Sequence, residues 1–265
     1  MGRWLLVLLA VLCTVQPLFA KPELTARSGS FRLVLDGGEV LSSPDLLGTV
    51  LNFTDDSGAL RRIRIDAVMP YPEAGGPMLH DFRVETAPGD WEPLCSPDAR
   101  GLRMGFPVAG AWDGNQHFVA DPTRLFVTCT SGARGKCVLF GYDPWRLGPD
   151  GKSLIPLYEA CQLMVRAAYC GDQGYTTDGT SIDYYDDLGI ARAETRGDPA
   201  YEFEAGWTPE GATCVAHPRH PEVIGMQALL GACPALATPS PCTEAAAKAA
   251  GAILFNRSRL VPANP

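Results

Sequence analysis

Acidic side chains crowd into one short stretch, residues 172–187, which holds Asp172, Asp178, Asp183, Asp186 and Asp187. No Lys or Arg occurs between residues 167 and 191, so no neighbouring cation neutralises them. Calcium takes about six to eight oxygen ligands, and turn-rich aspartate loops supply both carboxylates and backbone carbonyls. The chemical hypothesis that follows is a calcium site in which Asp178 and Asp183 are ligands and Asp172 or Asp186 completes the shell. The alternative, which we favour, is that these aspartates cap turns and face water, with no cofactor.

Two histidines in His217-Pro-Arg-His220 form a second possible metal site, for zinc or copper. They would share a face only on a helical turn, and Pro218 and Pro221 disfavour a helix there. We therefore expect neither histidine to bind a metal. His80 and His117 stand alone and are expected at the surface.

Nine cysteines occur in the chain, and those after Cys13 are Cys95, Cys129, Cys137, Cys161, Cys170, Cys214, Cys233 and Cys242. An even number in an exported protein is typical of disulfides, so we expect four bonds and no free thiol. Of the possible pairs we predict Cys233 with Cys242, because the two share a proline-rich segment. The absence of any C-x-x-C spacing argues against a zinc finger and against thioredoxin-like chemistry.

Nucleophilic catalysis finds little support in the sequence. A cysteine nucleophile would require Cys161 or Cys170 beside His217 and an aspartate, and the even cysteine count leaves neither thiol free. The chain has no G-x-S-x-G motif of a serine hydrolase and no phosphate-binding P-loop. The sequence therefore names no reaction by itself.

The first twenty residues have the layout of a signal peptide. Arg3 gives a positive start, an apolar run extends from Trp4 to Val15, and Pro17 follows. A run of about a dozen apolar residues is too short to cross a bilayer as a helix. We predict cleavage after Ala20, a mature chain without a transmembrane anchor, and a secreted or periplasmic location, with the choice between periplasm and medium left open. The alternative is an uncleaved membrane anchor.

The charge balance excludes one class of partner. The chain has 22 Lys and Arg against 30 Asp and Glu, a formal net charge of −8, and no basic run. Such a surface opposes binding to polyphosphates and anionic lipids. We expect no nucleic-acid partner, and the sequence identifies no other partner.

The first half of the chain, which must position part of these residues, is predicted to consist mainly of strands. Polar and apolar residues alternate over Phe31–Leu35, and two alternating runs within residues 49–68 flank an Asp-Asp-Ser-Gly turn, which predicts a β-hairpin. Further strands are expected at 81–86 and 102–108.

The second half mixes strands with one clear helix, residues 156–169. Its apolar face contains Leu157, Cys161, Met164 and Ala168 and should be buried against the strands that carry Cys129 and Cys214. Because Cys161 and Cys170 lie about two and a half helical turns apart, they should not pair with each other.

The remaining segments of the second half are expected as strands at 124–129 and 137–142, a loop over 171–190, and a hairpin of strands at 200–206 and 212–217 that turns at Pro209-Glu-Gly211. A last helix, capped by Thr243, is expected over 244–255.

Several segments in one order resemble a known bacterial family, the ADYC domain. The helix ends in Ala167-Ala-Tyr-Cys170, which is similar to the tetrapeptide that names the family, with Ala168 where the name has Asp. Further matching segments are Trp91–Cys95, Ala111–Asp113, Cys129–Ala133, Lys136-Cys137, Gly141–Trp145, Thr177–Thr180, Ile182-Asp183, Gly189-Ile190, Phe203–Trp207 and Gly211–Cys214. The resemblance spans roughly residues 30–217, and it implies a domain to which no function is assigned.

Together these observations predict a β-rich α+β fold, with antiparallel sheets, one central helix and disulfides. The expected division is a signal peptide at 1–20, an N-terminal β-rich region at 21–117, an ADYC-like disulfide-bonded domain at 118–230, and a C-terminal tail with a short helix at 231–265. Turn-borne tryptophans such as Trp91, Trp112, Trp145 and Trp207 would either fill the core or stack on a ligand. We favour a non-catalytic binding or structural module of the bacterial envelope or medium. The alternative is a secreted hydrolase or metal-dependent enzyme that uses the loop 172–187.

Overall fold

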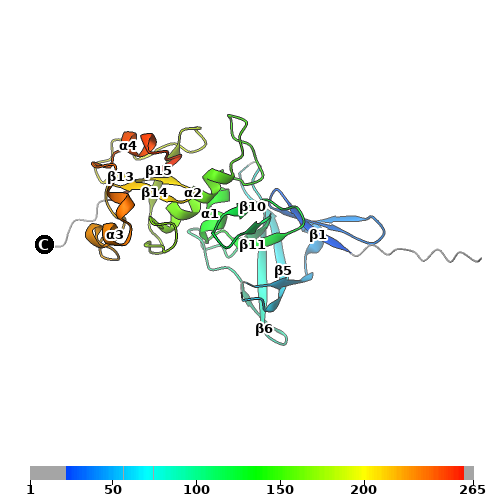
Figure 1. Cartoon of the computed structure of the whole chain (residues 1–265). Helices are drawn as coiled ribbons and strands as arrows, with labels where there is room; N and C mark the ends of the chain where they lie inside the picture. Colours follow the sequence, from blue (N-terminus) through cyan, green and yellow to red (C-terminus); the bar gives the residue numbers. More distant parts are fainter. Residues whose placement is uncertain (1–21, 56, 74, 260–265) are drawn as a thin grey trace, which may run out of the picture.

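The computed structural model describes residues 22–55, 57–73 and 75–259, so the predicted signal peptide lies outside the described residues. The described chain is rich in antiparallel strands, carries few helices and contains four disulfides, as the sequence predicted (Figure 1). Within this part of the chain, no helix is long and apolar enough to cross a membrane.

Strands of the first half form two sheets and a small hairpin. The three-stranded sheet contains β1 (Glu23–Arg27), β2 (Ser30–Val34) and β3 (Val40–Ser42). The larger sheet has the order β11-β8-β6-β5-β4, with β7 paired to β6, and its strands are β4 (Val50–Thr54), β5 (Leu60–Pro70), β6 (Met78–Ala87), β7 (Asp90–Pro93), β8 (Gly105–Ala109) and β11 (Leu125–Cys129). The hairpin pairs β9 (Ala111–Trp112) with β10 (Phe118–Val119).

Strands of the second half form one four-stranded sheet of order β12-β15-β13-β14. Its strands are β12 (Ile182–Asp186), β13 (Tyr201–Thr208), β14 (Gly211–Val215) and β15 (Leu254–Arg259). The helices are α1 (Ala133–Leu139), α2 (Ile155–Arg166), α3 (Met226–Ala232) and α4 (Glu244–Ala249), with 3-10 turns at Ser43–Leu46 and Pro234–Ala237. In Figure 1, α1 and α2 lie between the two larger sheets.

Both predicted hairpins are confirmed, as β4–β5 and as β13–β14. The predicted strand at 137–142 is wrong, because residues 137–139 end α1 and a turn follows. Helix α1 packs so closely on the preceding strand that a Cβ at Gly135 would lie 2.1 Å from the Cys129 carbonyl oxygen. The loop expected over 171–190 contains β12. The helix expected over 244–255 ends at Ala249, and β15 follows it. A short apolar run does not distinguish strand from helix, and this ambiguity explains the error at α1.

Helix α2 is the central packing element, as predicted, and its apolar face is buried. It packs on α1 and on β13, β14 and β15, and α1 in turn lies against β11. The predicted contact with the strand of Cys214 is therefore confirmed, and α1 connects α2 to the strand of Cys129.

The disulfides pair Cys95 with Cys129, Cys137 with Cys161, Cys170 with Cys233, and Cys214 with Cys242. All eight cysteines are bonded, and Cys161 does not pair with Cys170, as expected. The predicted pair Cys233–Cys242 is wrong: a 3-10 turn separates the two residues, and they bond instead to the end of α2 and to β14. Disulfides of this number are typical of an oxidising compartment.

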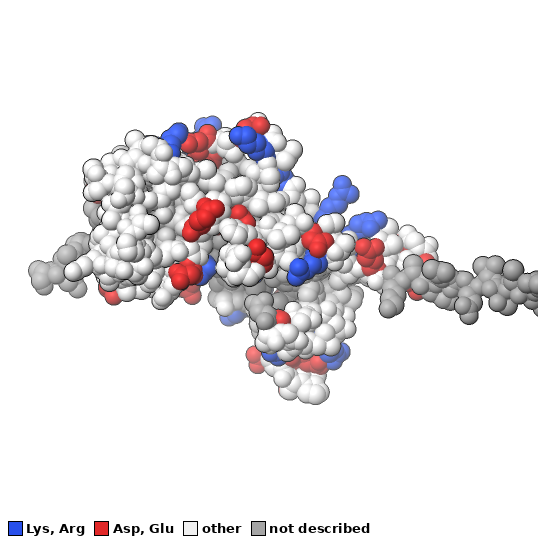
Figure 2. Space-filling model, in the orientation of Figure 1, with Lys and Arg blue, Asp and Glu red and all other residues white. Residues whose placement is uncertain are grey.

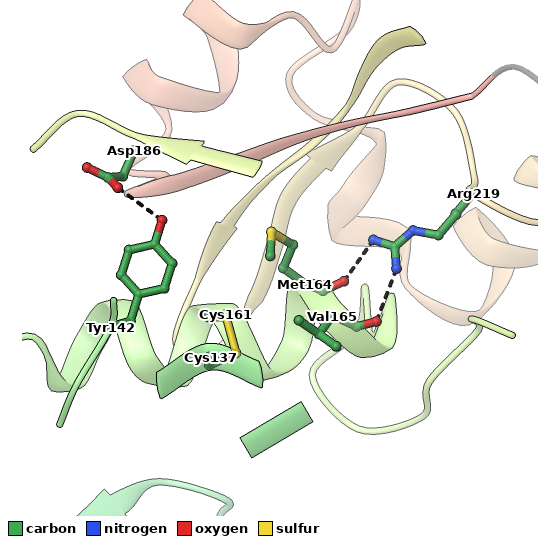
Figure 3. The surroundings of a disulfide bond; sticks show 7 residues. All are labelled: Cys137, Tyr142, Cys161, Met164, Val165, Asp186 and Arg219. Carbon is green, nitrogen blue, oxygen red and sulfur yellow. Dashed lines mark hydrogen bonds between the residues drawn. A yellow bond between two sulfur atoms is a disulfide. The ribbon is translucent and has the colours of Figure 1, made fainter. Parts of the chain in front are cut away.

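The end of α2 is held by a buried ion pair. The Arg219 guanidinium donates to both carboxylate oxygens of Glu204. It also donates to the carbonyl oxygens of Met164 and Val165 in the last turn of α2 (Figure 3). The Tyr169 hydroxyl donates to Glu204 at 3.0 Å and accepts from the Arg219 backbone N–H at 2.8 Å. Burial alone would raise the pKa of Glu204, and the adjacent guanidinium holds it below its ordinary value. This network fixes the helix that carries the site described below.

His80, which was expected at the surface, is instead fully buried, and its burial predicts a pH-dependent stability for the first half. His80 packs against Phe31 and Phe82 with ring centroids 5.1 Å away in each case, and burial lowers its pKa from 6.5 to about 4. Between those pH values the unfolded chain binds a proton that the folded chain does not. We expect the free energy of unfolding to fall as the pH drops from 6.5 to 4, by about 3 kcal/mol from this group.

Urea unfolding of wild type and His80→Phe across pH 4–7 measures this effect. The difference between the two proteins should change by about 3 kcal/mol over the range. A constant difference would contradict the assignment.

The charged surface shows no dominant sign on the face in Figure 2, where acidic and basic side chains alternate between broad uncharged areas.

Candidate functional site

A groove of about 840 Å³ lies between the β9–β10 hairpin and the polar face of α2; we call it the hairpin–helix groove. Helix α2 contributes Glu159, Gln162, Leu163 and Arg166 to it. These positions follow the spacing of one helical face, on the side away from the buried Cys161 and Met164. The helix therefore uses one face to build the core and the other to line the groove.

The opposite wall is the loop of the hairpin. The Asp113 carboxylate accepts the backbone N–H groups of Asn115 and His117 at 2.9 and 2.8 Å, which shapes the turn. The Glu159 carboxylate then accepts the Phe118 N–H at 2.6 Å, so the hairpin is bonded directly to α2. This bond keeps the two walls at a fixed separation.

An aromatic cluster packs the hairpin against α2. Trp112 packs on Phe118 and Tyr158 with ring centroids 5.7 and 5.5 Å away, and Phe118 packs edge-on against Tyr158 at 5.5 Å. The guanidinium of Arg134, at the start of α1, lies 4.7 Å from the centre of the Trp112 ring. Cation–π contact orients this arginine along the groove.

The ends of the groove come from other elements. One end is formed by residues 127–129 and Gly132, and the other by Cys170, Gly171, Asp172, Pro209 and Glu210. Two disulfides therefore reach the groove, through Cys129 and Cys170.

Charge in the groove is nearly balanced between Arg134 and Arg166 on one side and Glu159, Asp172 and Glu210 on the other. Burial raises the pKa of Glu159, while the Phe118 N–H and the nearby imidazole of His117 act in the opposite direction. His117 Nδ1 lies 3.6 Å from Glu159 Oε1. The balance favours an uncharged ligand over an anionic or cationic one.

Two hydrogen-bond donors in the groove walls have no acceptor among the described residues. They are the side-chain amide Nε2 of Gln162 and the indole Nε1 of Trp112. Gln162 is only 6% exposed. Both nitrogen atoms are almost completely inaccessible to solvent in this structure. A buried donor without a partner costs about 1–3 kcal/mol, so a small movement of the wall that exposed either atom would favour an incoming acceptor.

The aspartates of 172–187 are not gathered into one site. The Asp183 carboxylate accepts from the backbone N–H groups of Glu194 and Thr195 at 3.0 and 2.8 Å, and from the Thr195 hydroxyl. Asp172 and Asp178 are exposed. In the described ranges no group of three or more His, Cys, Asp or Glu side chains is placed to hold a metal ion.

Asp186 organises a turn in the same way. It accepts from the Tyr142 hydroxyl at 2.9 Å and from the backbone N–H groups of Leu188, Ile190 and Ala191 (Figure 3). The structure therefore does not bring together the four candidate calcium ligands, Asp172, Asp178, Asp183 and Asp186, and two of them accept backbone N–H groups.

The sequence named Trp112 but missed the other walls of the groove. Glu159, Gln162 and Arg166 recur at helical spacing on the polar side of the predicted helix, and this signal was available. The contribution of the 113–117 turn and of Arg134 depends on contacts between distant segments, which no local pattern discloses.

A family model for the ADYC domain matches residues 43–221, which is more than half of the chain. The match includes α2, the β9–β10 hairpin, the sheet of β4–β8 and β11, and three strands of the four-stranded sheet. No curated protein and no solved structure matched the chain. The match contains both sides of the hairpin–helix groove and both partners of the buried pair, Glu204 and Arg219. The chain belongs to the ADYC domain family.

Proposed function

We propose that this chain is an exported binding module of the bacterial envelope or medium, and that the hairpin–helix groove binds an uncharged glycan without converting it. The observation that carries this proposal is the pair of unpartnered donors, Gln162 Nε2 and Trp112 Nε1, in the walls of an 840 Å³ groove.

Export is supported by covalent chemistry and by the start of the sequence. Four disulfides persist only in an oxidising compartment, and residues 1–20 have the layout of a signal peptide. Either the periplasm or the medium satisfies both observations.

The ligand class follows from the composition of the groove. A glycan presents many uncharged donors and acceptors, which suits walls that offer amides, carboxylates and guanidinium groups together. The two unpartnered donors require acceptors, and the carbonyl of an acetamido sugar is a stronger acceptor than a hydroxyl. Acetamido glycans are therefore the best first probes.

The rival role, a hydrolase or metal-dependent enzyme that uses the aspartates of residues 172–187, has less support. Asp183 and Asp186 accept several backbone N–H groups each, which leaves these carboxylates bound to the chain and not directed at a substrate.

Binding can be measured on an array of neutral and acidic oligosaccharides, followed by calorimetry with chitotriose. We expect acetamido glycans to bind and Gln162→Ala to weaken chitotriose binding about fivefold, since one hydrogen bond contributes about 1 kcal/mol. The matched control is Gln227→Ala, an exposed glutamine of α3, which should bind as wild type. An array with no bound glycan, or a Gln162→Ala protein of unchanged affinity, would refute the proposal.

A further inference from the structure

A second, smaller cavity of about 280 Å³ lies beside the four-stranded sheet, away from the groove. Its walls contain residues 177–181, Arg219, His220, Ser258 and Arg259. Within it, His220 Nε2 lies 2.8 Å from the Thr180 hydroxyl oxygen, and His220 Nδ1 lies 2.8 Å from Glu222 Oε1. A hydroxyl, an imidazole and a carboxylate are thus joined in series.

This arrangement has the contacts required for nucleophilic catalysis. A hydroxyl becomes reactive when an imidazole within about 3.2 Å accepts its proton and a third group orients the ring. Such sites are recognised by geometry and not by sequence order, which explains why the absence of G-x-S-x-G did not exclude one.

Both partners of the contact are held by the fold. His220 directly follows Arg219, whose guanidinium is fixed in the core by Glu204 and by the end of α2. Thr180 closes a turn in which its backbone N–H and its hydroxyl both approach the Thr177 carbonyl oxygen, at 3.3 and 2.7 Å. In this structure the Thr180 hydroxyl donates to the Thr177 carbonyl, and His220 Nε2 also lies 3.2 Å from the Thr177 hydroxyl. The reactive arrangement requires the Thr180 hydroxyl to turn and donate to His220 Nε2 instead, over a distance of 2.8 Å.

We propose that Thr180, His220 and Glu222 form an acyl-transfer site that hydrolyses small acyl esters. Thr180 and His220 are its catalytic residues, and Glu222 positions the imidazole. The inference is independent of glycan binding in the groove, because the two cavities share no lining residue.

The steps balance without any further reactant except water. The Thr180 oxygen forms a bond to the acyl carbon while its proton passes to His220 Nε2. The tetrahedral intermediate collapses, the ester C–O bond breaks, and the leaving alcohol takes the proton from the imidazole. Water then attacks the acyl-threonine in the same way and releases the carboxylic acid. Arg259, which also lines the cavity, supplies positive charge near the oxyanion.

Hydrolysis of 4-methylumbelliferyl acetate by the full oxidised protein tests the proposal. We expect turnover above that of free imidazole at equal concentration, a loss of about a hundredfold or more in Thr180→Val and His220→Gln, and recovery in Thr180→Ser. Glu222→Gln should lower kcat and leave KM unchanged. The matched control is His217→Gln, which should hydrolyse the ester as wild type.

A second readout does not depend on these variants folding. Acid-quenched wild type should carry an acetyl group that peptide mapping places on Thr180. Wild-type turnover no faster than imidazole, full turnover by Thr180→Val, or acetylation only at other residues would overturn the proposal.

Discussion

Replacement of Arg219 by methionine is expected to lower the free energy of unfolding by about 3–5 kcal/mol, because it leaves the Glu204 carboxylate buried without its counter-charge. Glu204 and Arg219 are 0% and 2% exposed. The variant also removes the donors to the Met164 and Val165 carbonyl oxygens at the end of α2. Urea unfolding followed by near-UV circular dichroism measures the loss.

Two comparisons isolate the buried charge. The double variant Glu204→Gln/Arg219→Met should recover part of the lost stability, because it removes the uncompensated carboxylate. Arg62→Met breaks an exposed ion pair with Glu85 and should cost less than about 1 kcal/mol. If Arg219→Met costs no more than Arg62→Met, the buried network does not hold the end of α2.

Removal of the Cys137–Cys161 disulfide in a double alanine variant is expected to cost about 2–5 kcal/mol. This bond joins α1 to α2 directly (Figure 3). Because α1 carries Arg134 and α2 carries Glu159, the variant should also loosen two walls of the hairpin–helix groove and weaken chitotriose binding. The urea midpoint and the calorimetric affinity are the measurements.

The corresponding control is the Cys214–Cys242 bond, which links β14 to the segment before α4 and does not reach the groove. Its double alanine variant should lose stability and keep its affinity for chitotriose when folded. Equal loss of affinity in both variants would show that the disulfides act only through global stability.

Local patterns were sufficient to predict the hairpins and α2, because alternation and a one-sided apolar face are properties of a short segment. They failed at α1, where the short apolar run from Cys137 is compatible with either a strand or a helix. They also failed at β15. The alanine-rich helix before it is shorter than predicted, and β15 is an inner strand of a sheet whose other strands come from residues 182–215.

Contacts between segments that are far apart in the chain could not be predicted from the sequence. Proximity along the chain suggested Cys233–Cys242, whereas the folded chain places each cysteine beside another element. Nothing in the sequence links Glu204 to Arg219, or Thr180 to His220. The aspartates of 172–187 are clustered in the sequence but separate in space, where Asp183 and Asp186 each accept backbone N–H groups, as the favoured interpretation of turn-capping residues expected. The division at residues 117 and 230 stays a prediction.

The central claim, that the hairpin–helix groove is a glycan-binding site, is tested most directly by ¹H–¹⁵N NMR of the full protein titrated with chitotriose. The two unpartnered donors are the indole N–H of Trp112 and the side-chain amide of Gln162. Each gives an NMR signal that is distinct from the backbone amide signals. The account predicts that both signals shift along one binding curve, while the side-chain amide of Gln227 stays in place. Unshifted Trp112 and Gln162 signals at saturation, or shifts confined to residues outside the groove, would contradict it.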